Sequence, residues 1–317
     1  MNNRIEYLPV NEQHIDEAVK IAIGATARER EFIPFLPGND SRDYFYHTIK
    51  HLFSEGNGVA ALYQNRLAAF LAGFKVDEFH GTNPGIYCPI YGHGSIRENR
   101  IEIYRSLYQR AATLWLEKGL RTHAITVFTH DQDLVDTFFW QGFGLRCIDA
   151  IRKTSNIDVQ SSTVRIEEST VEDAEKLANI HTRANQYYRK SPMFMHRKDT
   201  DEILKHIDWL TGYRRHEWVA YRNDIPVGFL KIAPSEETFF SAYPSVMNIK
   251  GLYVIENERE KGVGTVLLNT IQKWFIQNNI PLCGVEFESI NTLGSRFWMK
   301  YFTPYTYSLV RKIDERI

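Results

Sequence analysis

The 317-residue sequence has little of several residue types, and each shortage excludes a class of protein. Its three cysteines, Cys88, Cys147 and Cys283, are too few and too scattered for a disulfide framework or a cysteine-rich metal motif. No apolar run approaches the length that spans a bilayer, and the N-terminus lacks the apolar segment of a signal peptide. A net charge of −1 argues against recognition of nucleic acid by overall charge. We therefore expect a cytoplasmic protein without membrane or nucleic-acid partners.

The eleven histidines lack a metal-binding spacing such as HExxH, so we expect no bound metal. Four of them in the second half of the chain share no spacing, and we interpret each as a surface residue: His181, His196, His206 and His216. Apolar residues make up 43% of the chain and charged residues 24%, which is typical of globular proteins. The length suits two domains of ordinary size, in a monomer or a homodimer.

The chain repeats itself once, at an offset of roughly 160 residues. Residues 61–71 (ALYQNRLAAFL) match residues 220–230 (AYRNDIPVGFL) without a gap, and both segments predict two strands around a tight polar turn. Residues 4–6 (RIE) recur as residues 165–167, and Phe139-Trp140 recurs as Phe297-Trp298. Several matches in the same order predict two domains of similar fold.

Each repeat predicts a strand, one or two helices, three strands, a helix, a strand, a helix and a strand. This order predicts an α/β fold of the α+β kind, in which a mixed central sheet is flanked by helices. Gly119 is the predicted C-cap of the long helix in the first repeat. The polar stretch 154–162 suits a linker, so we place the domains at residues 1–155 and 163–317.

A glycine-bearing turn at residues 259–264 (REKGVG) follows a strand-like run, 246–254, and opens a helix-like run, 263–277. The first N–H groups of a helix lack internal partners, and the helix dipole favours negative charge at that end. Gly262 and Gly264 allow the backbone to approach a ligand closely. We therefore predict a phosphate site here, the alternative being an ordinary glycine-rich turn.

These residues resemble the GNAT acetyltransferase superfamily, whose signature Arg/Gln-x-x-Gly-x-Gly/Ala is matched by residues 259–264. Leu252-Tyr253-Val254 reproduces the apolar-x-Val end of that family's fourth strand. Residues 291–298 (NTLGSRFW) resemble a later motif, Asn-x-x-Ala-x-x-Phe-Tyr, with a glycine for the alanine and a tryptophan for the tyrosine. Residues 138–144 (FFWQGFG) resemble the closing Phe-Tyr…Gly-Phe element. The resemblance covers nearly the whole chain in a tandem form, similar to the mycothiol-synthase-like architecture.

The resemblance implies an N-acetyltransferase that moves an acetyl group from acetyl-CoA to a primary amine of a small molecule or a peptide N-terminus. Acetyl-CoA would lie between the fourth and fifth strands of the second domain, with the N–H group of Val254 polarising the thioester carbonyl. The alternative is a non-catalytic acyl-CoA-binding or regulatory module. The implied cofactor contacts are Leu252, Tyr253, Val254, Arg259, Glu260, Lys261, Gly262, Val263, Gly264, Thr265, Asn291, Phe297 and Trp298.

The candidate base comes from the fifth strand. Glu286 and Glu288 alternate with apolar residues and share one face, so one of them reaches the site or both face solvent. Glu256 and Glu258 are interpreted as surface residues of the turn.

The family often protonates the leaving thiolate with a tyrosine where this chain has Trp298, and an indole N–H is a poor acid. Tyr301 is the preferred substitute, unless it is only a packing aromatic, and Tyr305 and Tyr307 are further candidates.

The two repeats differ at the signature. Aligning the long helices sets Asn99, Glu102 and Tyr104 opposite Arg259, Gly262 and Gly264. A carboxylate and a bulky ring there predict that the first domain does not bind acetyl-CoA in the usual way and has a structural role. Residues 92–95 (GHGS) are either a displaced phosphate loop or a flexible turn.

Residues 184–196 (ANQYYRKSPMFMH) read as a loop rich in aromatic residues and methionine. This segment is either a lip that holds an apolar amine or a core plug between the domains.

Overall fold

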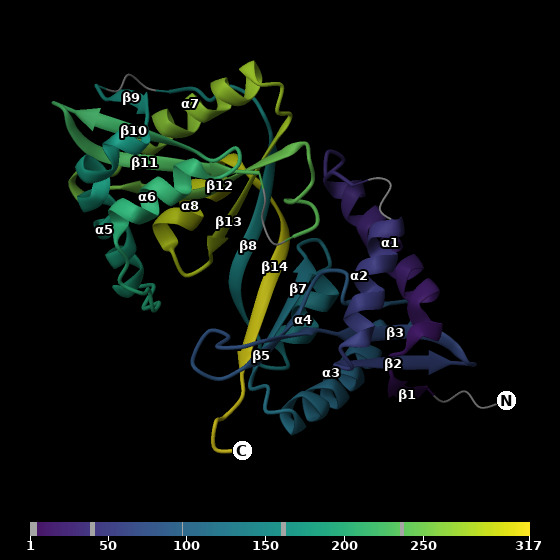
Figure 1. The fold of residues 1–317 in the computed structure, drawn as a ribbon. Coiled ribbons are helices and arrows are strands. Elements are labelled where there is room, and N and C mark those ends of the chain that lie inside the picture. The colour runs from purple at the N-terminus through teal and green to yellow at the C-terminus, as the bar shows by residue number, and fades with distance from the viewer. Residues whose placement is uncertain (1–4, 39–41, 97, 160–162, 235–237) are drawn as a thin grey trace. The chain divides into compact units, whose positions relative to one another are not determined.

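The computed structural model describes residues 5–38, 42–96, 98–159, 163–234 and 238–317 (Figure 1). Arg4 of the first repeat and residues 160–162 of the predicted linker lie outside the described residues. The chain divides into two compact units, Met1–Asp149 with Pro304–Ile317, and Ala150–Thr303. Strands and helices mix in both units, which confirms the predicted fold class of two tandem domains with flanked sheets. No described helix has the length and apolar character needed to cross a bilayer.

The first unit forms two groups of paired strands, in the orders β1-β2-β3-β6 and β4-β5-β7-β14. Its elements are β1 (Glu6–Pro9), α1 (Ile15–Phe32), α2 (Arg42–Ser54), β2 (Gly58–Tyr63), β3 (Arg66–Ala72), β4 (Phe74–Val76), β5 (Gly85–Cys88), β6 (His93–Ser95), α3 (Arg100–Glu117), β7 (Thr122–Phe128), α4 (Gln132–Phe139) and β14 (Thr303–Lys312). The division between the units falls within β8 (Gly144–Lys153). Gly119 follows α3 with a left-handed backbone (φ 75°), as a C-cap glycine does.

The second unit has the strand order β13-β12-β11-β10-β9. Its elements are β9 (Arg165–Glu168), α5 (Ala174–Arg189), α6 (Glu202–Thr211), β10 (His216–Arg222), β11 (Ile225–Ala233), β12 (Val246–Val254), α7 (Val263–Gln277), β13 (Leu282–Glu288) and α8 (Thr292–Tyr301). Neighbouring strands pair antiparallel except β12 and β13, which are parallel. Figure 1 shows α7 on one side of β10–β12 and α5 and α6 on the other.

The repeat predicted from the sequence is present in backbone detail. Hairpins β2–β3 and β10–β11 carry a bulge at the same point, Ala61/Leu62 and Ala220/Tyr221. In each tight turn two successive residues adopt the left-handed conformation that a two-residue hairpin turn requires, Gln64 and Asn65 in one and Asn223 and Asp224 in the other. The two hairpins are therefore equivalent.

One predicted match between the repeats is wrong. Asp131 and Asn291 cap α4 and α8, and each accepts a hydrogen bond from the backbone N–H three residues further on. Counting from these caps places Phe138 opposite Trp298, and both side chains are buried. The counterpart of Trp298 is therefore Phe138, whereas Phe139-Trp140 ends α4 with both side chains exposed.

The last strand belongs with the first unit. β14 pairs antiparallel with β7, from Thr306 opposite Phe128 to Lys312 opposite Thr122. The predicted domain limits, 1–155 and 163–317, assign β14 to the second domain, whereas its contacts group it with the first unit. That these limits describe domains that fold independently stays a prediction.

The fold depends on the buried face of α7, where Leu267 is fully buried. We expect Leu267→Ala to lower the free energy of unfolding by about 2–5 kcal/mol, because the smaller side chain leaves a cavity. The control is Ile276→Ala on the same helix, where the side chain is 47% exposed and the change should stay within about 0.5 kcal/mol. Denaturant unfolding measures both, and equal effects would contradict this packing.

Candidate functional site

The site begins where two neighbouring strands stop pairing. β12 and β13 pair from Val246 opposite Leu282 to Ile249 opposite Val285, and the pairing among described residues is not continued although both strands run on. β12 remains paired with β11 beyond a bulge at Lys250. A bulge adds one residue to a strand and bends it locally. A wedge-shaped opening between β12 and β13 therefore follows residue 249.

Two backbone N–H groups of β12 point into this wedge. Ile255 N donates to Val227 O at 3.0 Å, toward β11. Because N–H directions alternate along a strand, those of Leu252 and Val254 point the other way. On that same side, Val254 O accepts a hydrogen bond from Arg259 Nε at 3.0 Å. The wedge therefore offers donors at two alternate positions.

The N-terminus of α7 opens beside the wedge. Val266 N donates to Gly262 O at 3.0 Å, so the N–H groups of Val263, Gly264 and Thr265 precede the helix's own hydrogen-bond ladder. Gly262 is left-handed (φ 79°), a conformation that other residues adopt only at a cost. These three N–H groups and the helix dipole favour negative charge at this end of α7.

Gly264 keeps the space beside these N–H groups clear. A Cβ atom there would lie 3.4 Å from Phe297 and 3.6 Å from Leu252, so a side chain would extend into the opening.

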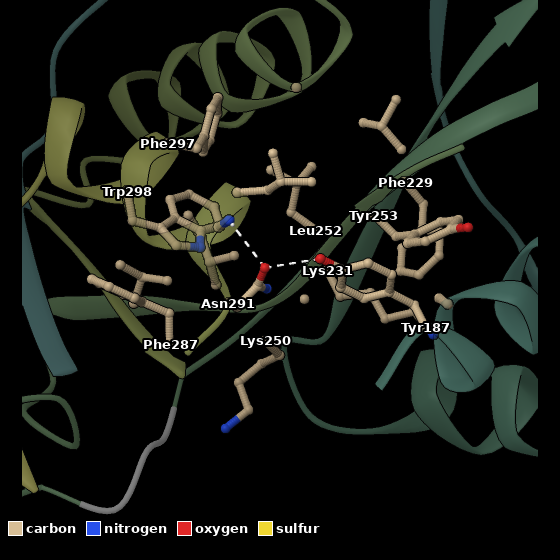
Figure 2. A pocket seen from close by; sticks show the side chains of 18 of the residues that line it. Tyr187, Phe229, Lys231, Lys250, Leu252, Tyr253, Phe287, Asn291, Phe297 and Trp298 are labelled. Carbon is tan, nitrogen blue, oxygen red and sulfur yellow. Dashed lines mark hydrogen bonds between the residues drawn. The ribbon is translucent and has the colours of Figure 1, made fainter. Parts of the chain in front are cut away.

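One cavity of about 1180 Å³ in the second unit joins the wedge and the helix start (Figure 2). Of the predicted cofactor residues, all but Lys261 line it: Leu252, Tyr253, Val254, Arg259, Glu260, Gly262, Val263, Gly264, Thr265, Asn291, Phe297 and Trp298. Lys261 is instead 3.4 Å from Glu258. The structure thus brings the predicted residues of β12, the start of α7 and α8 together around one cavity.

Arg259 has a visible role in shaping the turn. Besides its bond to Val254 O, its guanidinium lies over the rings of Tyr187 at 4.9 Å and Tyr253 at 5.7 Å. These contacts hold the signature arginine against β12 and α5.

Asn291 connects α8 with α5. Its Oδ1 accepts a hydrogen bond from Gly294 N at 3.2 Å and another from Tyr187 OH at 3.0 Å, the latter seen in Figure 2. A Cβ atom on residue 294 would lie 2.7 Å from the Asn291 side chain. Glycine replaces the alanine of the resembling motif here because the capping amide occupies that space.

The predicted catalytic residues lie at the same cavity. Glu286 and Glu288 are half-buried and line it rather than facing only solvent. Tyr301 is half-buried, and its hydroxyl is 3.2 Å from Thr265 Oγ1 in the first turn of α7. Tyr305 and Tyr307 belong to β14 of the first unit and do not line the cavity.

The corresponding place in the first unit is filled by side chains. The ring of His93 bridges Thr126 O on β7, at 2.7 Å from Nε2, and Tyr104 OH on α3, at 3.0 Å from Nδ1. Both rings are buried. Counted from their C-caps, Lys118 and Asn278, α3 begins one turn earlier than α7. Tyr104, the counterpart of Gly264, therefore lies within the helix, and its ring packs into the core of the first unit.

Two loop predictions need correction. Residues 93–95 of the GHGS segment form the buried strand β6, and are neither a phosphate loop nor a flexible turn. Residues 184–189 are the last turns of α5, because the helical spacing of α5 continues to Arg189. Of the remaining lip, Met193 is buried and Phe194 is exposed.

A buried polar cluster adjoins the cavity, and the sequence prediction missed it. His181 on α5 and His206 on α6 contact the carboxylate of Glu217 on β10, at 2.7 Å and 3.0 Å. All three are buried, which contradicts the prediction that these histidines lie on the surface. They offer three potential metal-ligand atoms within 4.8 Å of one another. The three residues are far apart in the sequence, so no spacing pattern connects them. The one feature of the sequence that indicated the cluster was a charged residue, Glu217, at an inward-facing position of a strand.

Burial and charge act in opposite directions on this cluster. Burial would raise the pKa of Glu217, but the hydrogen bond from His181, the close contact with His206 and the charge of Lys231, 3.7 Å away, lower it to about 2. Burial would lower the pKa of His206, and the contact with Glu217 raises it instead. Burial lowers the pKa of the Lys231 ammonium, which Glu217 opposes. The carboxylate is therefore ionised inside the protein.

Glu217→Gln should lower the free energy of unfolding by about 3 kcal/mol near neutral pH, because it leaves buried cations without their anion. The folded pKa of Glu217, about 2, lies below its ordinary value of 4.5. Its contribution is therefore complete above the ordinary value and is lost as the pH falls through that interval. Denaturant unfolding from pH 7 to 2.5 should show the wild-type advantage shrinking.

The control for this experiment is Glu168→Gln, which removes a half-exposed carboxylate 2.7 Å from His216. It should change stability by less than about 1 kcal/mol. A pH-independent difference between wild type and Glu217→Gln would contradict the ionised carboxylate.

The second unit resembles a known protein family. The model of the acetyltransferase (GNAT) family matches residues 177–294, within the second unit. Among curated proteins no significant match is found.

Solved structures with this fold cover nearly the whole chain. A GCN5-related N-acetyltransferase from Sphaerobacter thermophilus is 10% identical, with 98% of this chain and 96% of that chain covered and a TM-score of 0.61. A GCN5-related glucosamine N-acetyltransferase region of a fungal multi-domain GH3 β-N-acetylglucosaminidase is 12% identical, with 98% and 38% covered and a TM-score of 0.54. A tandem GNAT protein from the clavulanic acid biosynthesis pathway is 12% identical, with 98% of both chains covered and a TM-score of 0.49. The match of the family model over residues 177–294 agrees with the signature at residues 259–264, and the chain has the fold of a GCN5-related N-acetyltransferase.

Proposed function

We propose that the second unit is an N-acetyltransferase that transfers an acetyl group from acetyl-CoA to a primary amine of a small molecule or a peptide N-terminus. One observation carries this proposal: the N–H groups of Leu252 and Val254 open into the same cavity as the free N–H groups of α7. A strand edge that pairs with amide groups and a helix start that binds anions together suit a pantetheine arm ending in phosphates.

Acetyl-CoA binds with its pyrophosphate at the N–H groups of Val263, Gly264 and Thr265. Its pantetheine amides pair with β12, and the thioester carbonyl accepts a hydrogen bond from Val254 N. A donor fixed in place for a developing oxyanion lowers the barrier by about 3 kcal/mol.

The reaction needs a neutral amine and a protonated leaving group. The amine nitrogen attacks the thioester carbon, the C–S bond breaks, and the thiolate takes up a proton. Tyr301 donates that proton, and Thr265 Oγ1, 3.2 Å from its hydroxyl, orients it. Glu286 and Glu288 place negative charge at the cavity wall and attract a cationic amine.

The first unit has a structural role in this proposal. His93 and Tyr104 occupy the space that Leu252 and Gly264 leave open in the second unit, so acetyl-CoA binds only the second unit.

A non-catalytic acyl-CoA-binding module is the second candidate. It is favoured by Trp298, which is buried where the family often has a tyrosine acid. Both candidates predict acetyl-CoA binding, and only the first predicts amine-dependent turnover.

Gly264→Glu should weaken acetyl-CoA binding by roughly 100-fold or more, because it puts a carboxylate beside the phosphates at the helix start. Gly262→Glu should act similarly, with a stability cost of about 1 kcal/mol for its left-handed backbone. Gln277→Glu is the control, since it adds the same charge at the exposed far end of α7. Isothermal calorimetry gives the affinities, and unchanged affinity in both glycine variants would place the cofactor elsewhere.

Tyr301→Phe should lower kcat by roughly 100-fold and leave acetyl-CoA affinity unchanged, because the variant keeps the ring and loses the acidic hydrogen. Thiol release from acetyl-CoA is followed with tyramine, spermidine, glucosamine and an alanine-terminated peptide. Tight acetyl-CoA binding without turnover of any amine would favour the binding module. Unchanged kcat in Tyr301→Phe would remove Tyr301 from the mechanism.

A further inference from the structure

The cluster of His181, His206 and Glu217 has a defined hydrogen-bond direction. The Glu217 carboxylate is ionised and therefore only accepts hydrogen bonds. His181 Nε2, 2.7 Å from Glu217 Oε1, must consequently be the donor. In its neutral form His181 then carries its proton on Nε2 and a lone pair on Nδ1.

This lone pair has no assigned use within the fold. Among the described residues, His181 Nδ1 is buried without a hydrogen-bond partner. Buried polar atoms are nearly always paired, so an exception in a cavity wall indicates a ligand, a water or a catalytic use. His181 is itself one of the residues that line the cavity.

His206 anchors the other side of the carboxylate. Its Nε2 donates to Thr170 O at 2.9 Å, and its Nδ1 lies 3.0 Å from Glu217 Oε2 in an ion-pair contact that lacks hydrogen-bond alignment. Fixed at one oxygen by His206 and at the other by His181, the carboxylate has little freedom to rotate. The arrangement is that of a histidine held by a buried carboxylate, which is how proton-accepting histidines are oriented.

The distances favour a hydrogen-bonded network over a metal site. Two ligands about 2.0–2.1 Å from a tetrahedral ion are separated by roughly 3.3 Å. His181 Nε2 and Glu217 Oε1 are only 2.7 Å apart, which is a hydrogen-bond length. Lys231 adds a positive charge 3.7 Å from the same carboxylate, which opposes a cation there.

One side chain of β11, Phe229, lies between His181 and the strand segment that would hold the thioester. The ring of His181 packs edge-on against Phe229, with centroids 4.8 Å apart. Phe229 is paired across β11 and β12 with Tyr253, the residue between the two wedge-facing N–H groups. Figure 2 shows Phe229 and Tyr253 side by side at the cavity.

We propose that His181 Nδ1 is the proton acceptor for the amine substrate, and that Glu217 positions it. This inference rests on the proposed acetyl transfer and names the base that sequence motifs do not reveal. Glu286 and Glu288 then attract the amine, and His181 deprotonates it.

His181, Tyr301 and solvent account for every proton that moves in the reaction. The substrate ammonium gives one proton to His181 Nδ1, directly or through one water, and the resulting amine attacks the thioester carbon. The nitrogen loses its second proton after the C–N bond forms, and the thiolate gains one from Tyr301 as the C–S bond breaks. That second proton restores Tyr301, and His181 releases the first to solvent, so one proton leaves per acetyl group.

The titratable groups near His181 come from several elements, including Glu172 and Asp173 of the 3-10 turn Val171–Asp173 that contacts α5 and α6. β10 supplies Glu217, β11 supplies Lys231, α6 supplies His206, Glu202 and Lys205, and β12 supplies Tyr253. The pH profile of the reaction therefore reports on this whole cluster, and variants are needed to assign it to His181.

The test compares wild type with His181→Gln, whose amide can still donate to Glu217. With the best amine of the panel, kcat/KM of the variant should be about 100-fold lower at pH 7. The deficit should shrink as the pH approaches about 10, where a free alkylamine becomes neutral without help. Acetyl-CoA affinity, measured by calorimetry, should be unchanged, because the proposed cofactor contacts come from β12 and α7.

Two further variants separate catalysis from structure. Glu217→Asp keeps the negative charge on a shorter side chain that reaches less far toward His181. It should shift the acid limb of the plot of kcat/KM against pH and also lower the maximum of that plot. His216→Gln removes a histidine–carboxylate pair that does not line the cavity, and it should retain wild-type kinetics. A His181→Gln profile that parallels the wild-type profile at every pH would overturn the inference.

A measurement on the wild type does not depend on variant folding. Nitrogen-15 NMR of the histidine rings should show His181 as the Nε2–H tautomer, and protonation at Nδ1 alone would overturn the inference. Wild-type protein that turns over none of the amines would overturn the proposed function and this inference together. Turnover that His181→Gln leaves intact would overturn this inference alone.

Discussion

The loss of pairing between β12 and β13 after Ile249 and Val285 is the constraint on which the site depends. Backbone N–H groups that leave a sheet need other partners, and those of Leu252 and Val254 are directed into a cavity. The bulge at Lys250 keeps β12 joined to β11 while it leaves β13. The same divergence makes room for α7 to begin at the opening, so strand edge and helix start share one space.

The two units show how the same frame is used in two ways. In the second unit, glycine at position 264 and a short helix start leave the opening clear. In the first unit, α3 starts one turn earlier, and Tyr104 and His93 close the gap with hydrogen bonds. Side-chain volume at a few positions, rather than topology, separates an open wedge from a filled one.

The buried carboxylate of Glu217 is the second organising feature. An ionised group is stable inside the protein only when opposite charges and donors surround it. His181, His206 and Lys231 supply them from three different elements. Because His181 donates a hydrogen bond to the Glu217 carboxylate, its ring is held in one orientation in the cavity wall. Its other nitrogen, Nδ1, has no hydrogen-bond partner among the described residues.

Local patterns were sufficient for much of the fold and for most of the predicted residues that line one wall of the cavity. Alternation, turn residues and the glycine signature predicted the hairpins, α7 and the strand before it, because these depend on neighbouring residues. The Phe139-Trp140 match and the loop at residues 184–189 were wrong because helix caps and helix length depend on packing. By itself the sequence determined a repeated fold with one intact glycine signature. Only the tertiary structure brought His181, His206 and Glu217 together and placed β14 beside β7, because contacts between distant segments leave no spacing along the chain.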